Sequence, residues 1–401
     1  MNSYSQVGWQ SFGKRSTYNR MSLNSVLFLF CFYLMIVMTV INGNKYVAAI
    51  AFTWFPLYLL TGCSLIYPRK LFKYDHFAMF AILIGISALM STLLSDVVSI
   101  ENCRGILSYT ICYAIITTVT LSKNDFKRLI WFYLFFSLLL CLILLFNYTF
   151  SIGISSAHRV SIQYAGIRKD SNYLSSFIVP SFGIFLYLGL NKSETIYFIY
   201  GGIIFIALFL AGSRASFVTM LVVALIIFIY YIFLNKQISS IKKFLFTFLL
   251  VIAVIIVYYY LSNSIIFART TDFDNYDNNA RLLIWNYALE AFYRNPLFGS
   301  GSMSGNYFSQ MHVRWVTHSC YISLICAQGI IGALLVVNMW IGYSKVNKYN
   351  MIFNIIIMIS FFFPLMFIDG YEGANFWVPM MMCRFISDKA REYDNLVNVL
   401  L

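Results

Sequence analysis

The sequence predicts an all-α, polytopic membrane protein, and three observations lead to that fold class. The chain of 401 residues is 60% hydrophobic and only 11% charged, far outside the range of soluble globular chains of this length. Its mean hydropathy is +0.76. Apolar runs recur from end to end, and each is long enough to cross a hydrocarbon core of about 30 Å as a helix. A transmembrane β-barrel would show short segments of alternating polarity, so we expect helices throughout.

Windows of roughly 19 residues place about twelve transmembrane spans along the chain. The expected spans are residues 24–42, 46–66, 76–94, 105–121, 128–147, 173–190, 196–212, 216–234, 243–262, 318–342, 351–368 and 374–387. The expected divisions are a tail at 1–23, spans one to nine at 24–262, a loop at 263–317, spans ten to twelve at 318–387, and a tail at 388–401.

The positive residues alternate between the loops, and the formal net charge is +13. Clusters such as Arg69–Lys70, Lys123–Arg128 and Lys345–Lys348 occupy every second loop, in phase with the basic N-terminal tail. Lysine and arginine are enriched in cytoplasmic loops, so the sequence predicts both termini in the cytoplasm. Charges in short loops between spans indicate membrane topology and contact with anionic lipid, and we expect no nucleic-acid partner.

Eight cysteines are present, mostly within apolar runs and without a CxxC pair. This pattern lacks the ligand spacing of zinc sites and the framework of a small disulfide-rich protein. We therefore expect small, buried core residues and no metal site.

The longest loop on the side opposite the basic clusters, residues 263–317, contains "NNARLLIWNYALEAFYRNPLFGSG". Its apolar residues recur at helical spacing, which predicts a short amphipathic helix that ends at Pro296. Asn278 or Asn279 is expected to cap its N-terminus. Long loops are uncommon and are often functional, so this loop is a candidate cap over a site.

Arg214 is a single charge between two apolar runs, in "LFLAGSRASFVTM" at 208–220. The loop alternation places it on the side where cations are less favoured, so it is not the usual cytoplasmic anchor. Snorkelling of an arginine at a helix end is one alternative. Binding of a negatively charged ligand is the other.

Further cations share that side, since Arg281 and Arg294 flank the predicted helix and His318 lies where the loop meets span ten. Taken singly, they fit solvated loop charges and a hydrogen-bonded structural histidine. Taken together, arginines bind phosphate oxygens bidentately, and histidine can act as a general base. The combination suits a diphosphate-linked lipid substrate whose acceptor hydroxyl loses a proton.

Two other ligand sites are conceivable in the same loop. "TDFDNYDNN" has acidic spacing that is similar to a calcium loop, but the required glycine and terminal glutamate are missing. The glycines of "GSGSMSG" could form a phosphate nest, although Gly/Ser turns are common.

Three segments resemble a known family in order and spacing across about 208–335: "LAGSRASFVTMLV", "ARLLIWNYALEAFYRNPLFGSG" and "HSCYISLICAQGIIGALLVV". The family is the O-antigen ligase/O-antigen polymerase superfamily of bacterial membrane glycosyltransferases. "GIRKDSNYLSSFIVPSFG" at 166–183 resembles the outward segment and following span of the same family, whereas the first five expected spans match only in being hydrophobic.

The resemblance implies twelve spans, with a partly helical periplasmic loop between spans nine and ten. It also implies an undecaprenyl-diphosphate-linked glycan as substrate and a metal-independent, inverting glycosyl transfer without a cofactor. Arg214, Arg281 and His318 match the family's catalytic positions. Many members have asparagine after the histidine, where this chain has Ser319. Further candidates for substrate binding, by position, are Arg159, Arg168, Arg294 and Arg314.

The function expected from this resemblance is an O-antigen or surface polysaccharide polymerase in the bacterial inner membrane, with its active site facing the periplasm. The "RKDSNYL" segment and an Arg-x10-Gly pattern from Arg294 to Gly305 favour a polymerase. The alternatives are an O-antigen ligase that transfers the glycan to lipid A core, and a twelve-span transporter or flippase. The expected partners are the lipid-linked oligosaccharide, the lipid bilayer, a chain-length regulator and a flippase.

Overall fold

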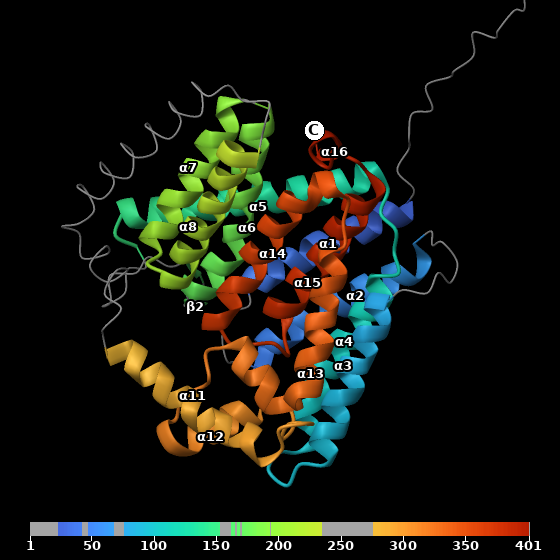
Figure 1. The fold of residues 1–401 in the computed structure, drawn as a ribbon, viewed down its shortest axis with the longest axis vertical. Helices are drawn as coiled ribbons and strands as arrows, with labels where there is room; N and C mark the ends of the chain where they lie inside the picture. Colours follow the sequence, from blue (N-terminus) through green and yellow to red (C-terminus); the bar gives the residue numbers. More distant parts are fainter. Residues whose placement is uncertain are drawn as a thin grey trace, which may run out of the picture.

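The protein is a bundle of helices in the computed structural model, which describes residues 23–41, 47–67, 76–152, 162–164, 167–168, 171–192, 194–234 and 276–400 (Figure 1). The α-helices are α1 (Leu23–Ile41), α2 (Val47–Ile66), α3 (His76–Leu93), α4 (Arg104–Ile116), α5 (Lys123–Thr149), α6 (Ser171–Lys192), α7 (Thr195–Leu210), α8 (Arg214–Ile229), α11 (Tyr276–Arg294), α12 (Ser304–Val313), α13 (Cys320–Ser344), α14 (Met351–Phe362), α15 (Ala374–Glu392) and α16 (Val397–Leu400).

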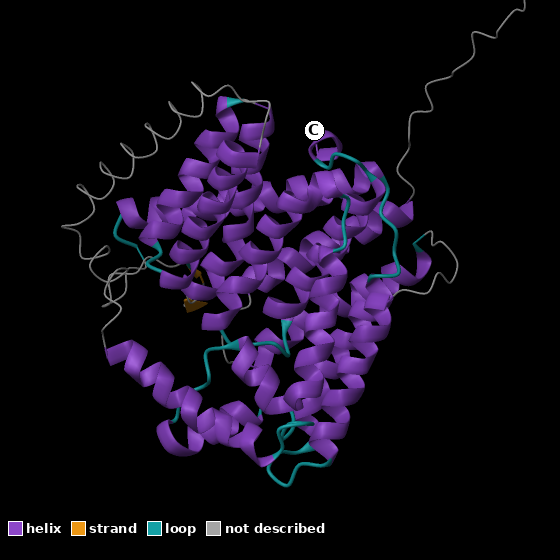
Figure 2. Cartoon of the chain, in the orientation of Figure 1, coloured by secondary structure: helices purple, strands orange, loops and turns teal. Residues whose placement is uncertain are grey.

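Short irregular elements connect these helices (Figure 2). They are the 3-10 turns η1 (Ile100–Cys103), η3 (Lys348–Asn350) and η4 (Phe363–Phe367), and the π-helical turn η2 (Tyr230–Leu234). Two strands, β1 (Gln163–Tyr164) and β2 (Ile167–Arg168), pair antiparallel just before α6. The prediction of a helical fold is confirmed.

A helix is present at every expected span except 243–262, which lies outside the described residues. Among the described residues, 7 helices are long and apolar enough to cross a membrane. The multi-pass character is thereby confirmed, while the number of twelve spans stays a prediction. The expected span at 128–147 is longer than predicted, since α5 runs from Lys123 to Thr149.

The loops predicted to share a side of the membrane meet in space. At one end, Trp131 Nε1 donates to Leu400 O at 2.7 Å, and Asn347 Nδ2 donates to Asp394 Oδ1 at 2.7 Å. We call residues 122–131, 342–350 and 384–400 the basic end, and residues 95–104, 296–323 and 369–373 the cap end. In these described loops the alternation follows the predicted pattern, and the assignment of each end to a cell compartment stays a prediction.

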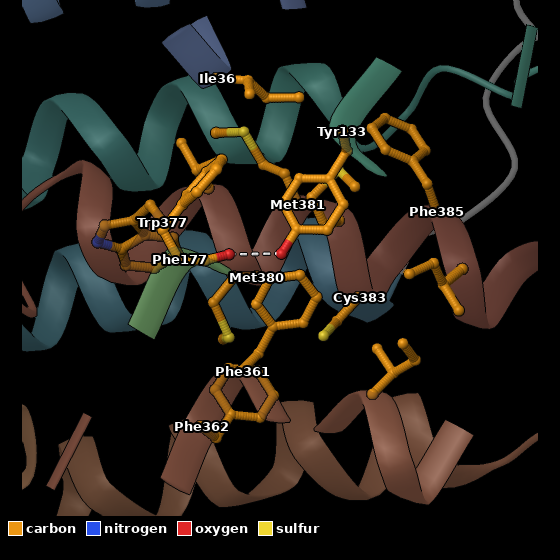
Figure 3. Packing of buried hydrophobic residues seen from close by; sticks show 14 of the residues in the cluster. Ile36, Tyr133, Phe177, Phe361, Phe362, Trp377, Met380, Met381, Cys383 and Phe385 are labelled. Atoms are coloured by element: carbon orange, nitrogen blue, oxygen red, sulfur yellow. Dashed lines mark hydrogen bonds between the residues drawn. The ribbon is translucent and has the colours of Figure 1, made fainter. Parts of the chain in front are cut away.

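Helix α15 lies at the centre of the bundle, although 374–387 was the shortest expected span. It packs against α1, α4, α13 and α14, and every residue from Phe376 to Cys383 is buried. Tyr133 of α5 donates to the carbonyl of Phe177 at 2.5 Å within the same core (Figure 3). Its apolar stretch is short because charged residues begin at Arg384, which is why the expected span was the shortest.

The C-terminal segment is packed more closely than the expected tail at 388–401. Helix α15 continues to Glu392, and Val397, Val399 and Leu400 of α16 are buried against the bundle. The eight cysteines are all free and buried, as expected for core residues.

Helices α11 and α12 form a cap that packs on the first half of α13 (Figure 1). The predicted amphipathic helix is confirmed as α11. It begins at Tyr276, so Asn278 and Asn279 lie inside its first turn and the expected capping role is wrong. Helix α12 has a left-handed residue at each end, with φ of 63° at Met303 and 57° at Arg314, and these residues set its direction between two loops.

Helix α13 is interrupted at Gly329, whose φ of 62° and ψ of −159° break the helical backbone. The groups released by the break bond to the loop after α11. Ile330 N donates to Pro296 O at 2.9 Å and Ile331 N to Leu297 O at 3.1 Å, while Ser300 N donates to Cys326 O at 2.9 Å. The cap is thus joined to α13 by backbone hydrogen bonds, and not by side-chain packing alone.

Candidate functional site

His318 lies directly before the first turn of α13, in the left-handed region with φ of 50°. Ser319 is the N-cap, and its Oγ accepts a hydrogen bond from Ile322 N at 3.3 Å. Asparagine is an equally good N-cap, so the difference from the family's His-Asn pair preserves the capping function. The imidazole is half-buried, with its ring 6.2 Å from that of Trp315.

The residue before His318 is held from three directions. Thr317 is fully buried, and its amide donates to Asn306 Oδ1 of α12 at 3.0 Å. Its Oγ1 lies 2.7 Å from Ser323 Oγ of α13, and its carbonyl accepts from Trp285 Nε1 of α11 at 2.8 Å. With Thr317 fixed and Ser319 capping the helix, the backbone of His318 has little freedom, which preorganises its side chain.

Arg281 lies one helical turn before the Trp285 contact on α11. It lies four residues before Trp285 on α11, so both side chains leave one face of the helix. That face meets the 317–318 segment, since Trp285 bonds to the carbonyl of Thr317. Arg281 is half-buried there.

Arg214 is the first residue of α8, after the tight turn at Ala211–Ser213. Val223 of α8 and Ser360 of α14 both pack against Gly183, which fixes the level of the two antiparallel helices. Arg214 lies nine residues before Val223, and Asp369 lies nine residues after Ser360. Each stretch rises roughly 14 to 17 Å toward the same end of the bundle, so the two residues lie at a similar level. Helix α8 and the start of α13 also share a neighbour, since α8 and α13 both pack against η4. Arg214 therefore lies at the cap end of its helix, on the side of Asp369.

Asp369 was not identified from the sequence, yet it connects the elements around His318. Its Oδ2 accepts from Asn306 Nδ2 of α12 at 2.8 Å, and its Oδ1 accepts from Ser323 Oγ of α13 at 2.8 Å. The same two residues bind Thr317. The available signal was two acids between glycines in "IDGYEG", a short loop that reads as a solvated turn.

Glu372 is a second carboxylate in this loop, and its Oε1 accepts from Met303 N at 3.0 Å. Burial raises the pKa of Glu372 to about 7, and the nearby charge of Asp369 acts in the same direction, while hydrogen bonds from Tyr371, Met303 and Ser302 oppose the rise. Glu372 thus fixes the start of α12 and can change its charge near neutral pH.

The glycine-rich segment after α11 does not form a phosphate nest. Its amides are used within the protein: Gly301 N donates to Ala327 O and to Ser91 Oγ, and Ser302 N donates to Thr92 Oγ1 at 2.9 Å. Amides committed to protein acceptors cannot point at a phosphate.

The calcium alternative falls largely on residues outside the described part of the chain, at 271–275. Within the described residues, no group of three or more His, Cys, Asp or Glu side chains lies together as potential metal ligands.

The other candidate arginines that the structure describes lie on three different elements. Arg294 is exposed, with its guanidinium 4.6 Å from the centre of the Phe308 ring, so it packs on α12. Arg314 is exposed at the C-terminus of α12, where its amide donates to Gln310 O at 3.2 Å. Arg168 lies in β2 opposite Gln163. Arg159 lies outside the described residues.

The fold and this end of the bundle define a multi-pass helical membrane protein with a polar end built from irregular backbone, arginines, a histidine and two carboxylates. Residues 199–337 match the family model Wzy_C, described as O-antigen ligase. This match supports the resemblance to the O-antigen ligase/polymerase superfamily, whose members are membrane glycosyltransferase-like enzymes. The matched range runs from α7 into α13 and includes Arg214, Arg281 and His318. No curated protein matches the chain.

Proposed function

We propose that this protein is a polysaccharide polymerase that joins undecaprenyl-diphosphate-linked glycan repeat units on the periplasmic face of the inner membrane. The observation that supports it is the fixed backbone around His318. Three elements hold Thr317 beside it, within the range that matches the O-antigen ligase family. A group that must accept a proton in a defined geometry requires such preorganisation.

The proposed reaction is a single displacement with inversion. The acceptor hydroxyl attacks the anomeric carbon, a C–O bond forms there, and the bond from that carbon to the diphosphate oxygen breaks. His318 takes the proton of the attacking hydroxyl, a contribution of roughly 10²- to 10⁴-fold in rate. The lipid diphosphate leaves with the bonding electrons, so no metal or cofactor step is needed.

Arg214 and Arg281 would bind the diphosphate and stabilise the charge that develops on it, each by a few kcal/mol as for one preorganised donor. Arg214 also stands at the N-terminus of α8, where the unpaired amides of the first turn favour an anion. Arg159, Arg168, Arg294 and Arg314 stay candidates for glycan or phosphate binding. Asp369 would act as a positioning residue, through Asn306 and Ser323.

The ligase remains the second candidate, and the description of the matching family as O-antigen ligase is the observation that favours it. The two enzymes use the same donor and differ in the acceptor. The pattern from Arg294 to Gly305 does not help to separate them, because Arg294 packs on Phe308 and Gly305 faces Cys326 and Thr317 at close range. The "RKDSNYL" segment is then the feature that supports the polymerase.

A deletion strain examined for its surface glycan tests the proposal. A lost polymerase leaves a single repeat unit on the lipid A core. A lost ligase leaves long polymer on the lipid carrier and bare core, which would overturn the polymerase assignment in favour of the second candidate. Unchanged glycan in the deletion strain would reject both and revive the transporter alternative. A chain-length regulator and a flippase stay predicted partners.

A further inference from the structure

The loop between α11 and α12 exposes apolar side chains, whereas a loop in water is expected to expose polar ones. Leu297 and Phe298 are 56% and 40% exposed, and they follow the exposed Tyr293 of α11. The loop is bonded to the middle of α13 at the Gly329 break. Its position along α13 can therefore be compared with the thickness of a membrane.

The basic end supplies the starting level for this comparison. The rings of Phe77 and Tyr343 stack there at 4.8 Å, and the guanidinium groups of Arg384 and Arg391 lie 4.8 and 5.3 Å from the Phe77 ring. Arg391 also donates to Lys345 O at 2.6 Å. A cluster of cations of this kind belongs at a membrane surface.

Counting along two helices from that level gives the depth of the loop. Ile331, which donates to Leu297 O, lies about 18 Å from Tyr343 at 1.5 Å per residue, within the regular half of α13. Ser91, which accepts from Gly301 N, lies about 21 Å from Phe77 along α3. Both distances are well short of a hydrocarbon core of about 30 Å. Helix tilt would only bring the loop closer to the midplane.

The surroundings of the loop fit that depth. Ile330, Leu334, Val337 and Ile341 are exposed along one face of α13, as expected of a face in contact with lipid. The bonds from Ile330 and Ile331 place Pro296 and Leu297 at the cap-side end of this face. Irregular backbone is tolerated in a membrane where protein satisfies its polar groups, and here α13 and α3 do so.

We propose that residues 296–301 form a re-entrant segment that enters the leaflet on the cap side, with Leu297 and Phe298 in contact with lipid acyl chains. The segment anchors the α11–α12 cap to the bilayer, independently of the proposed chemistry.

Spin labels on single added cysteines test this in the full chain, reconstituted in phosphatidylethanolamine/phosphatidylglycerol vesicles. Leu297→Cys is compared with Leu334→Cys, which is 55% exposed in the middle of α13, and with Gln310→Cys, an exposed polar position of α12. The native cysteines are buried, and the parent chain measures their background. The readout is the ratio of relaxation by oxygen to relaxation by a water-soluble nickel complex.

We expect the ratio at position 297 to be several-fold above that at 310 and to approach that at 334. A ratio equal to that at 310 would place the loop in water and overturn the proposal. A label at 297 that neither reagent reaches would show that protein covers the loop, which overturns it as well. Phe298→Cys is the second variant if Leu297→Cys does not fold, and the same outcomes apply to it.

Discussion

The basic end and the cap end use carboxylates in different ways. At the basic end, acids pair with nearby cations: Arg128 with Asp125 at 3.4 Å, Arg384 with Asp388 at 3.1 Å and Lys389 with Glu392 at 2.5 Å. At the cap end, Asp369 and Glu372 accept from an amide side chain, a hydroxyl and a backbone N–H. Asp125, Asp388 and Glu392 at the basic end thus pair with cations, whereas Asp369 and Glu372 at the cap end hold irregular backbone in position.

The difference between the two ends indicates which of them is suited to hold a functional site. Ion pairs within a helix turn need no special backbone, and exposed ones contribute little stability. The cap end contains the left-handed residues His318, Met303 and Arg314, and the break at Gly329 in α13 is bonded to its loop. Each of these conformations persists only because its surroundings determine it. Such overdetermined backbone is typical of functional sites.

The largest expected effect comes from removing the proposed catalytic groups. His318→Ala and Arg214→Ala should each lower polymer formation by roughly 10²-fold or more, because a proton acceptor or an anion-binding group is lost. Glycan length and amount in complemented deletion strains measure this, with membrane insertion checked by immunoblot. Arg128→Ala at the basic end is the matched control and should retain activity. Normal glycan in both cap-end variants would reject the mechanism.

The next largest effect is expected on stability, from adding a side-chain carbon where the backbones of the loop and α13 touch. A Cβ on Gly299 would lie 2.4 Å from the Ala327 backbone, and one on Gly329 would lie 2.4 Å from Leu297 O, both at positive φ. Gly299→Ala and Gly329→Ala should each cost about 3 kcal/mol or more and reduce the yield of folded protein. Detergent-solubilised thermal stability is the measurement. Gly202→Ala, with nothing within 4 Å of its Cβ position, serves as the control.

A smaller loss of stability is expected when one carboxylate at each end is replaced by an amide. Asp369→Asn leaves a hydrogen bond from Asn306 or Ser323 without its acceptor, a cost of about 1–3 kcal/mol in the cap. Asp125→Asn does the same to Tyr67 at the basic end. Both variants should lose thermal stability, but only Asp369→Asn should slow glycan formation. Equal rates in the two variants would contradict the positioning role of Asp369.

The smallest effect is a pH dependence at Glu372. Its pKa is raised from 4.5 to about 7 in the folded protein, so folding favours the protonated acid. The stabilising contribution is complete below pH 4.5 and is lost as the pH rises through about 7. The apparent Tm should therefore fall by about 2 °C or more between pH 5 and pH 8. Glu372→Gln should remove this part of the pH dependence, and an unchanged slope would contradict it.

Much of the fold could be predicted because lipid imposes simple rules on a sequence. Long apolar runs predicted the helices, and the alternation of cations predicted which loops share an end of the bundle. The break in α13 could not be predicted, because a single Gln-Gly pair in "CAQGIIGALLVV" is compatible with an uninterrupted helix, and only the loop that bonds to it explains the conformation of Gly329. The burial of α15 from Phe376 to Cys383 was missed for a related reason, since burial inside a bundle and exposure to lipid select similar residues.

The candidate site was predictable only in part. Arg214 was singled out as a charge between apolar runs, and Arg281 and His318 because their segments resemble the family; their roles stay predictions. Asp369, Asn306 and Ser323 were missed because short polar residues in turns and helix ends have many ordinary roles, and their function depends on contacts between segments far apart in the sequence. The glycine-rich loop was open to a ligand interpretation for the same reason.

The left-handed backbone at His318 restricts how this position can vary. With φ of 50°, it accepts glycine, asparagine, aspartate and histidine far more readily than branched or bulky residues. Histidine is the member of that set whose side chain exchanges a proton near neutral pH. Lysine, tyrosine or cysteine would each combine a change of chemistry with a conformational cost. The positive φ at position 318 thus limits which proton-accepting side chains a relative with the same turn can carry there.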